Sequence, residues 1–145
     1  MSARDRVLFV CIRNSARSQM AEGFLNALCA DKFVAESAGL EPGNLNPLAV
    51  TAMHEVGIDI SEKGTQSVFD VFKSRRLYSY VVTVCDEASA ESCPIYPAIV
   101  KRMHWSIPDP AVVEGSYDYR MRAFREARDA IRAKVEEFCG APCPA

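Results

Sequence analysis

Cys11, Arg17 and Ser18 have the types and the spacing of an oxyanion-binding site. A short apolar run ends at Cys11, and five residues separate this cysteine from Arg17. Backbone N–H groups between the two can surround a tetrahedral anion, and the Arg17 guanidinium can hold two of its oxygens through forked hydrogen bonds. The same donors favour a nucleophilic thiolate at Cys11. We therefore predict an oxyanion-binding loop made of Ile12, Arg13, Asn14, Ser15, Ala16, Arg17 and Ser18.

Two side chains of this loop could support the sulfur and the backbone. Ser18 could donate a hydrogen bond to the Cys11 sulfur, and Asn14 can adopt the left-handed or turn conformation that closes the loop. The stretch lacks the glycines and the Gly-Lys ending of an ATP-type phosphate loop, which excludes that class of site. The competing interpretation is a buried structural cysteine that happens to precede a helix.

A second apolar run, residues 81–84, ends at Cys85. If this run and the one before Cys11 form neighbouring parallel strands, both sulfurs lie at the same edge of the sheet. A second cysteine beside a thiolate nucleophile can resolve a covalent adduct as a disulfide. Cys85 is therefore a candidate resolving cysteine.

Cys93 follows Cys85 after seven small or acidic residues that suit a mobile surface segment. If this segment is helical, its two cysteines lie about 12 Å apart, whereas a disulfide needs Cα atoms within about 7 Å of each other. A Cys85–Cys93 bond therefore requires residues 86–92 to rearrange, and it could carry oxidising equivalents from a recessed site to the surface. The competing interpretation is two unrelated cysteines beside a loop.

Asp109 is the candidate general acid. It lies between Pro108 and Pro110, which stiffen the backbone and hold the carboxyl group just after the last predicted strand. A carboxylic acid at this edge of the sheet could protonate a departing oxygen. An Asp-Pro pair alone is only a turn signal, so the connection with catalysis depends on the Cys11–Arg17 loop.

Strand and helix patterns that alternate along the chain position these residues. This order predicts an α/β fold with a parallel sheet, right-handed crossovers and helices on both faces. In such sheets the ligand crevice lies beyond the carboxyl ends of the strands. We predict strands at residues 6–10, 33–38, 77–84 and 100–105, and helices at residues 18–30 (capped by Ser18), 47–56, 68–72 and 117–138.

The composition is that of an ordinary globular protein. The 145 residues are 49% hydrophobic and 25% charged, with a formal net charge of -2, so we expect one domain over residues 1–145 with a mobile tail at 139–145. The charge balance argues against a nucleic-acid partner. No run reaches membrane-spanning length and no signal peptide is evident, so we expect no membrane association and a cytoplasmic location. In that compartment the six cysteines would be reactive rather than structural.

The chain resembles the low-molecular-weight protein tyrosine phosphatases in its Cys11–Ser18 loop and its late Asp109-Pro110 pair. With Cys85, Cys93-Pro94 and His104-Trp105 added, it is similar to the thioredoxin-coupled arsenate reductases built on that fold. The resemblance implies a four-stranded parallel sheet in the order 2-1-3-4. It also implies that Cys11 attacks arsenate, that Cys85 attacks the adduct and releases arsenite, and that Cys93 then takes over the disulfide. Thioredoxin would reduce the Cys85–Cys93 bond.

We expect no cofactor and no metal, with potassium binding near Asn14, Glu22 and Ser37 as the open alternative. Some relatives bind potassium through an asparagine, a glutamate, a serine and an aspartate; Asn14, Glu22 and Ser37 match, but the aspartate is missing. His54 and His104 lack metal-ligand spacing. We expect a monomer, and we expect no role for the remaining cysteines, which are Cys29, Cys139 and Cys143.

Three hypotheses from different classes therefore stand. The first is an arsenate reductase that uses Cys11, Cys85 and Cys93 with thioredoxin or a similar thiol, glutaredoxin and small thiols being open alternatives. The second is a phosphotyrosine or phosphate-ester phosphatase that uses Cys11, Arg17 and Asp109. The third is a non-catalytic oxyanion-binding or thiol-sensing protein. The presence of Cys85 and Cys93 favours the reductase over the phosphatase. The presence of Cys11, Arg17 and Asp109 together argues against a non-catalytic protein.

Overall fold

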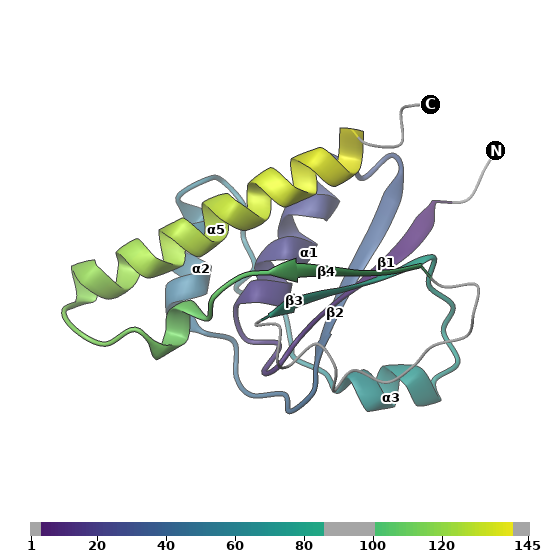
Figure 1. The fold of residues 1–145 in the computed structure, drawn as a ribbon, viewed down its shortest axis with the longest axis horizontal. Coiled ribbons are helices and arrows are strands. Elements are labelled where there is room, and N and C mark those ends of the chain that lie inside the picture. The colour runs from purple at the N-terminus through teal and green to yellow at the C-terminus, as the bar shows by residue number, and fades with distance from the viewer. Residues whose placement is uncertain (1–3, 86–100, 141–145) are drawn as a thin grey trace.

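A parallel four-stranded sheet forms the centre of the computed structural model, which describes residues 4–85 and 101–140 (Figure 1). Its strand order is β2-β1-β3-β4, and every neighbouring pair is parallel. This confirms the expected order. The strands are β1 (Asp5–Cys11), β2 (Phe33–Gly39), β3 (Tyr80–Cys85) and β4 (Lys101–Ser106).

Helices cover both faces of the sheet, as predicted. Three of them lie on one face and the short α3 lies on the other (Figure 1). The helices are α1 (Arg17–Leu28), α2 (Pro47–His54), α3 (Val68–Lys73) and α5 (Tyr117–Gly140), and a 3₁₀ turn, η1 (Pro110–Val112), precedes α5.

Strand β1 is buried on both faces because it lies inside the sheet. Val7 and Phe9 belong to the core cluster beneath α1, α2 and α5, whereas Leu8 and Val10 belong to the cluster beneath α3. Successive side chains of a strand point to opposite faces, so an uninterrupted apolar run is what this position requires. The run ends at Cys11, and the strand thereby delivers this cysteine to the carboxyl edge of the sheet.

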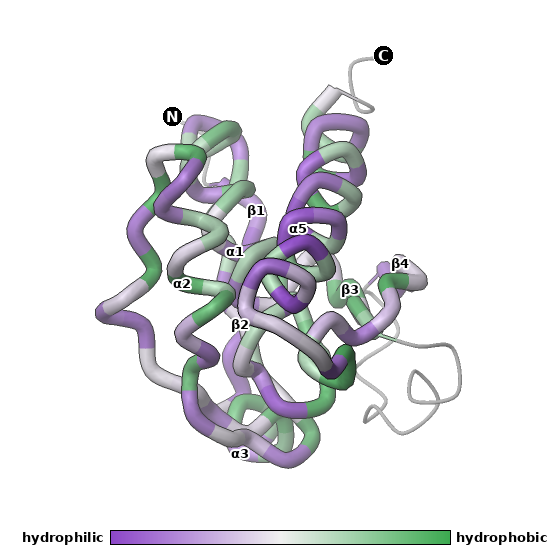
Figure 2. The backbone as a smooth tube through the Cα atoms, turned by 90° about the vertical axis from the view of Figure 1, so that its left-hand side faces the viewer, coloured by the Kyte–Doolittle hydropathy of each residue, from purple (hydrophilic) through white to green (hydrophobic). Residues whose placement is uncertain are grey.

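Helix α5 buries one stripe of its surface. Hydrophilic and hydrophobic residues alternate along it in Figure 2, as expected of a helix with one face toward the core. The stripe consists of residues three or four positions apart: Met121, Phe124, Ala127, Ile131, Val135 and Phe138. It fixes α5 against α1 and α2 and so sets the position of the chain that enters it from Asp109.

Two local expectations are wrong. Ser18 does not cap α1: the helix begins at Arg17, Ala16 occupies the cap position, and no side chain caps the end. The Ser18 hydroxyl instead lies beside the Cys11 sulfur. The last helix continues to Gly140, so Cys139 lies in α5 rather than in a tail. Cys139 lies four positions after Val135 and packs against the same core cluster, so the apolar pattern continues past the point where we expected the tail to begin.

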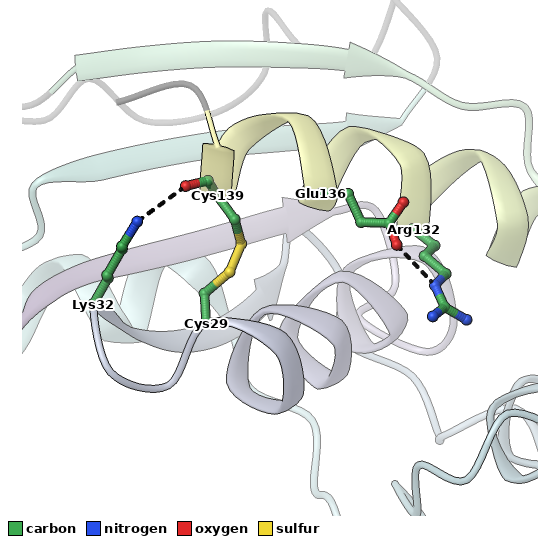
Figure 3. Close-up of a disulfide and its surroundings, with 5 residues drawn as sticks. All are labelled: Cys29, Lys32, Arg132, Glu136 and Cys139. Atoms are coloured by element: carbon green, nitrogen blue, oxygen red, sulfur yellow. Dashed lines mark hydrogen bonds and ion pairs between the residues drawn. A yellow bond between two sulfur atoms is a disulfide. The ribbon is translucent and has the colours of Figure 1, made fainter. Parts of the chain in front are cut away.

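Cys29 and Cys139, for which we expected no role, form a disulfide with a Cα–Cα distance of 6.3 Å. The bond joins the end of α1 to the end of α5 (Figure 3). Cys143 lies outside the described residues. In the two described ranges, no helix combines the length and the apolar composition needed to cross a membrane.

Candidate active site

Cys11 is held at the turn between β1 and α1 by two hydrogen bonds to its sulfur. Its side chain is buried, and Sγ lies 2.9 Å from Ser18 Oγ and 3.2 Å from the Asn14 backbone nitrogen. Ser18 Oγ also accepts a hydrogen bond from Asn14 Nδ2 at 2.8 Å. Because that oxygen accepts from Asn14, its own hydrogen is available for the sulfur. Two donors thus stabilise negative charge on Cys11.

The left-handed backbone of Asn14 closes the loop. Its φ is 55°, a conformation that asparagine tolerates better than most residues. The side chain is buried, and its Oδ1 accepts a hydrogen bond from the Gln66 backbone N–H at 3.0 Å. Asn14 therefore connects the loop to the segment before α3 as well as to Ser18.

The carbonyl groups of residues 11–15 all accept hydrogen bonds from groups outside the loop. Those of Cys11, Ile12, Arg13 and Ser15 accept hydrogen bonds from the backbone of residues 40–46, and that of Asn14 accepts one from the buried Gln19 side chain. In a trans peptide the N–H points opposite to the preceding C=O. The N–H groups of residues 12–16 therefore face the inside of the loop, where an oxyanion would bind.

Gly39 makes this arrangement possible at the end of β2. A Cβ atom at this position would lie 2.7 Å from the Asn14 nitrogen and 2.8 Å from the Arg13 carbonyl carbon. The loop can pass only because Gly39 has no side chain. Sequence reasoning missed Gly39 and Gln19; a glycine that ends a strand beside the loop is a signal that could have indicated the first.

Arg17 and Asp109 meet at the same edge of the sheet. Arg17 is buried, its Nη1 donates to the Ile107 carbonyl oxygen at 2.8 Å, and its Nη2 lies 3.7 Å from Asp109 Oδ2. The Asp109 carboxylate also accepts a hydrogen bond from the Ala111 N–H at 2.9 Å, which fixes the turn into η1. The turn that follows β4 thus positions Asp109 and holds the guanidinium of Arg17, which α1 brings to the same place.

The remaining predicted residues are placed in part. Cys85 ends β3 and is buried at the edge of the sheet where Cys11 ends β1. In the loop, Arg13 is exposed, Ile12 and Ser15 are half-buried, and Ala16 is buried. Cys93, its neighbour Pro94 and the predicted segment 86–92 lie outside the described residues.

The donor set that some relatives use for potassium does not fit a bound ion here. The Glu22 carboxylate pairs with the Lys63 ammonium and accepts a hydrogen bond from Ser37 Oγ at 2.5 Å. The Asn14 amide is engaged by Ser18 and Gln66. Lys63 thus supplies the positive charge that Glu22 needs. Within residues 4–85 and 101–140, no cluster of His, Cys, Asp and Glu side chains could hold a metal ion.

Comparisons with known proteins agree with this geometry. The family model described as low molecular weight phosphotyrosine protein phosphatase matches residues 6–141. An arsenate reductase of Shouchella clausii is 44% identical over 91% of this chain and 93% of its own length. An arsenate reductase of Bacillus subtilis is 42% identical over the same shares. A solved structure of an arsenate reductase in the oxidized state is 31% identical, has a TM-score of 0.79, and aligns over 94% of this chain and 98% of that one.

Proposed function

The chain belongs to the low molecular weight phosphotyrosine protein phosphatase family, and from this premise we propose that it is an arsenate reductase. The observation that carries the proposal is the position of Cys85. It ends the strand next to β1, so a second buried cysteine shares the sheet edge of the Cys11 loop. Hydrolysis of a phosphate ester needs no such cysteine, whereas reduction of arsenate needs thiols that supply two electrons.

In the first step of the proposed mechanism, the Cys11 thiolate attacks arsenate. The N–H groups of residues 12–16 and the Arg17 guanidinium hold the arsenate oxygens. A sulfur–arsenic bond forms, one arsenic–oxygen bond breaks, and Asp109 gives a proton to the oxygen, which leaves as water. The 3.7 Å contact between Arg17 and Asp109 supports this division of roles, because it places the acid beside the anion-binding group.

In the second step, Cys85 attacks the sulfur of Cys11. The electron pair of the sulfur–arsenic bond passes to arsenic, arsenite leaves, and a Cys11–Cys85 disulfide forms. Cys93 then attacks Cys85, which restores the Cys11 thiolate and leaves a Cys85–Cys93 disulfide. The part of Cys93 is proposed from the sequence alone, since this residue lies outside the described ranges.

Thiols that supply two electrons must reduce the final disulfide, and we assign this part to thioredoxin. The relay also requires reduced thiols between turnovers, which is the condition that the cytoplasm maintains. Every residue in the mechanism comes from one chain, so a monomer suffices.

Weak phosphatase activity is the second proposed function. Cys11, Arg17 and Asp109 together supply a nucleophile, an anion clamp and a general acid. This set can hydrolyse a phosphate ester without Cys85 or Cys93. We expect this activity to persist when either of these two cysteines is replaced by serine.

The deciding experiment measures arsenate-dependent oxidation of NADPH with thioredoxin and thioredoxin reductase. Wild type should turn over repeatedly, and Cys11→Ser should be inactive because a serine hydroxyl stays protonated and attacks poorly. Hydrolysis of para-nitrophenyl phosphate by the same preparations is the control. Rapid ester hydrolysis without arsenate-dependent oxidation would assign the protein to the phosphatases instead.

A further inference from the structure

Cys29 and Cys139 form a disulfide that the proposed arsenate chemistry does not use. Cys29 follows α1, and Cys139 lies in the last turn of α5 (Figure 3). The two residues are separated by 110 positions in the sequence. Their Cα–Cα distance of 6.3 Å lies within the range usual for disulfides.

This pair is remote from the candidate active site. Helix α1 begins at Arg17, beside Cys11, and its 12 residues end at Leu28, just before Cys29. A helix of that length spans about 18 Å. The sulfur of Cys29 therefore cannot exchange directly with that of Cys11, and the disulfide is separate from the Cys11–Cys85 pair.

The surroundings hold the two cysteines together even without the bond. Cys29 is 6% exposed and Cys139 packs against the same core cluster. Beside them, the rings of Phe33 and Phe138 lie 4.9 Å apart, and Lys32 Nζ donates to the Cys139 carbonyl oxygen at 3.4 Å (Figure 3). Reduced thiols at these positions would remain small apolar side chains in a packed core. We therefore expect the fold to be the same whether the bond is open or closed.

We propose that Cys29 and Cys139 are a site of reversible thiol oxidation that clasps α1 to α5 when the surrounding thiol pool becomes oxidised. The oxidant is a low-molecular-weight disulfide. One cysteine thiolate attacks it, forms a mixed disulfide and releases one small thiol. The second cysteine displaces the other small thiol, so that one small disulfide is reduced and one protein disulfide forms. This proposal does not depend on the arsenate reductase function.

The clasp acts on stability rather than on turnover. A bond between positions 110 residues apart closes a long loop and restricts the unfolded chain strongly, provided that the native geometry accepts it. The oxidised protein should therefore unfold at a higher temperature than the reduced protein. Because the bond lies far from Cys11, oxidation at this site should leave the anion-binding loop unchanged.

Tryptic mapping tests whether the bond forms. Wild type is incubated with oxidised glutathione, alkylated without reduction and digested. Cys29 lies in the peptide of residues 18–32 and Cys139 in that of residues 135–145, whereas Cys11 lies in 7–13 and Cys85 and Cys93 share 77–101. We expect a cross-link between 18–32 and 135–145 that dithiothreitol removes. Full alkylation of Cys29 under these conditions would overturn the proposal.

Thermal unfolding of the same samples tests the consequence. Wild type in oxidised glutathione should melt about 5–15 °C above Cys139→Ser in the same buffer, and dithiothreitol should remove most of this difference. Cys29→Ser is the second variant, and Cys143→Ser, which shares the 135–145 peptide, is the matched control that should keep both the cross-link and the melting temperature. A cross-link that persists in Cys139→Ser, or one without an effect on melting, would overturn the clasp.

Discussion

The Cys11 sulfur accepts hydrogen bonds from the Asn14 N–H and the Ser18 hydroxyl, and these two donors are positioned in different ways. The Asn14 N–H belongs to the loop backbone and comes with the left-handed turn, whereas the Ser18 hydroxyl is oriented by a second contact from the Asn14 amide. A side chain that is itself held in place loses less freedom when it binds a charge. Ser18 is therefore expected to contribute to the reactivity of Cys11.

Replacing Ser18 by alanine should slow the reaction of Cys11. The variant loses one hydrogen bond to a charged sulfur, which corresponds to a decrease of roughly 10- to 100-fold in rate. The measurement is alkylation of Cys11 by iodoacetamide at pH 7, followed in the 7–13 peptide. Ser18→Thr retains a hydroxyl and serves as the control. Equal alkylation rates for wild type and Ser18→Ala would show that the 2.9 Å contact has no effect on the thiolate.

Substitutions of Arg17 and Asp109 should affect different steps, anion binding for Arg17 and proton transfer for Asp109. Arg17→Lys replaces a fork by a single ammonium, so it should weaken binding of phosphate, a competitive anion, and lower kcat/KM at least 10-fold. Asp109→Asn should leave phosphate binding within about 3-fold of wild type but slow hydrolysis of esters with poor leaving groups by roughly 100-fold or more. If Asp109→Asn hydrolyses such esters at the wild-type rate, the Asp-Pro pair is only a turn.

Residue types and spacing were sufficient to predict the loop because its members are contiguous. Residues 11–18 carry the nucleophile, the guanidinium and the hydroxyl within one turn, so local sequence contains the site. The supporting contacts could not be predicted in the same way. The Ile107 carbonyl and the Gln66 N–H are backbone groups, which every residue has, so residue type does not indicate them. Both are also far in sequence from the loop residues that they contact. The prediction that Ser18 caps α1 was wrong because the Ser18 hydroxyl hydrogen-bonds the Cys11 sulfur instead.

At the scale of elements, the end of β2 supports the loop through a glycine. Gly39→Ala places a methyl group within 3 Å of the Asn14 and Arg13 backbone, so the loop must shift. We expect phosphate binding to weaken by more than 10-fold and the free energy of unfolding to fall by about 1–3 kcal/mol. Gly43→Ala is the matched control, because its nearest neighbour would be the Arg13 side chain at 3.9 Å. Isothermal titration with phosphate and urea unfolding provide the two readouts, and equal results for the two variants would contradict the steric argument.

Glu36, in the middle of β2, connects this strand to β1 and to the segment that precedes β3. Its carboxylate accepts hydrogen bonds from Arg6 on β1 at 3.0 Å, from Arg76 at 2.5 Å and from Tyr78 at 2.6 Å. Burial alone would raise the pKa of Glu36, but the hydrogen bonds from Tyr78 and Arg76 and the charges of Arg76 and Arg6 lower it. Conversely, burial and the hydrogen bond to Glu36 raise the pKa of Tyr78.

This cluster predicts a dependence of stability on pH. A carboxylate whose pKa is lower in the folded than in the unfolded state stabilises the protein above the unfolded value of about 4.5, and this contribution disappears as pH falls through the folded value. Glu36→Gln should therefore lower the free energy of unfolding by about 1 kcal/mol at pH 7, a modest amount because the arginines are partly exposed. The difference from wild type should shrink below pH 4.5. Urea unfolding from pH 7 to pH 3 measures it, and a difference that stays constant would exclude Glu36 as the titrating group.

On the scale of the whole molecule, the arrangement of sheet and helices could be predicted from the sequence, but the contact between the ends of α1 and α5 could not. The alternation of strands and helices predicted a parallel sheet with two covered faces, and the strand order came from the family resemblance. The periodicity of the last helix showed which side is buried. It could not show that the end of α5 reaches the end of α1, because that contact depends on how two long elements cross the same sheet. The Cys29–Cys139 bond was missed for this reason.

The proposed relay makes a whole-molecule prediction, since oxidation must pass from the buried Cys11 to the surface. Cys85→Ser should form the arsenic adduct but release no arsenite. Cys93→Ser should release about one equivalent of arsenite and then stop with a Cys11–Cys85 bond, because no third thiol remains to displace Cys11.

Tryptic mapping after arsenate treatment would reveal that bond as a link between peptides 7–13 and 77–101, whereas wild type should carry its disulfide within 77–101. The Cys29–Cys139 link appears in different peptides, so the two disulfide systems can be distinguished in one digest. Sustained turnover of Cys93→Ser with thioredoxin would remove Cys93 from the mechanism and leave Cys11 and Cys85 as the complete redox pair.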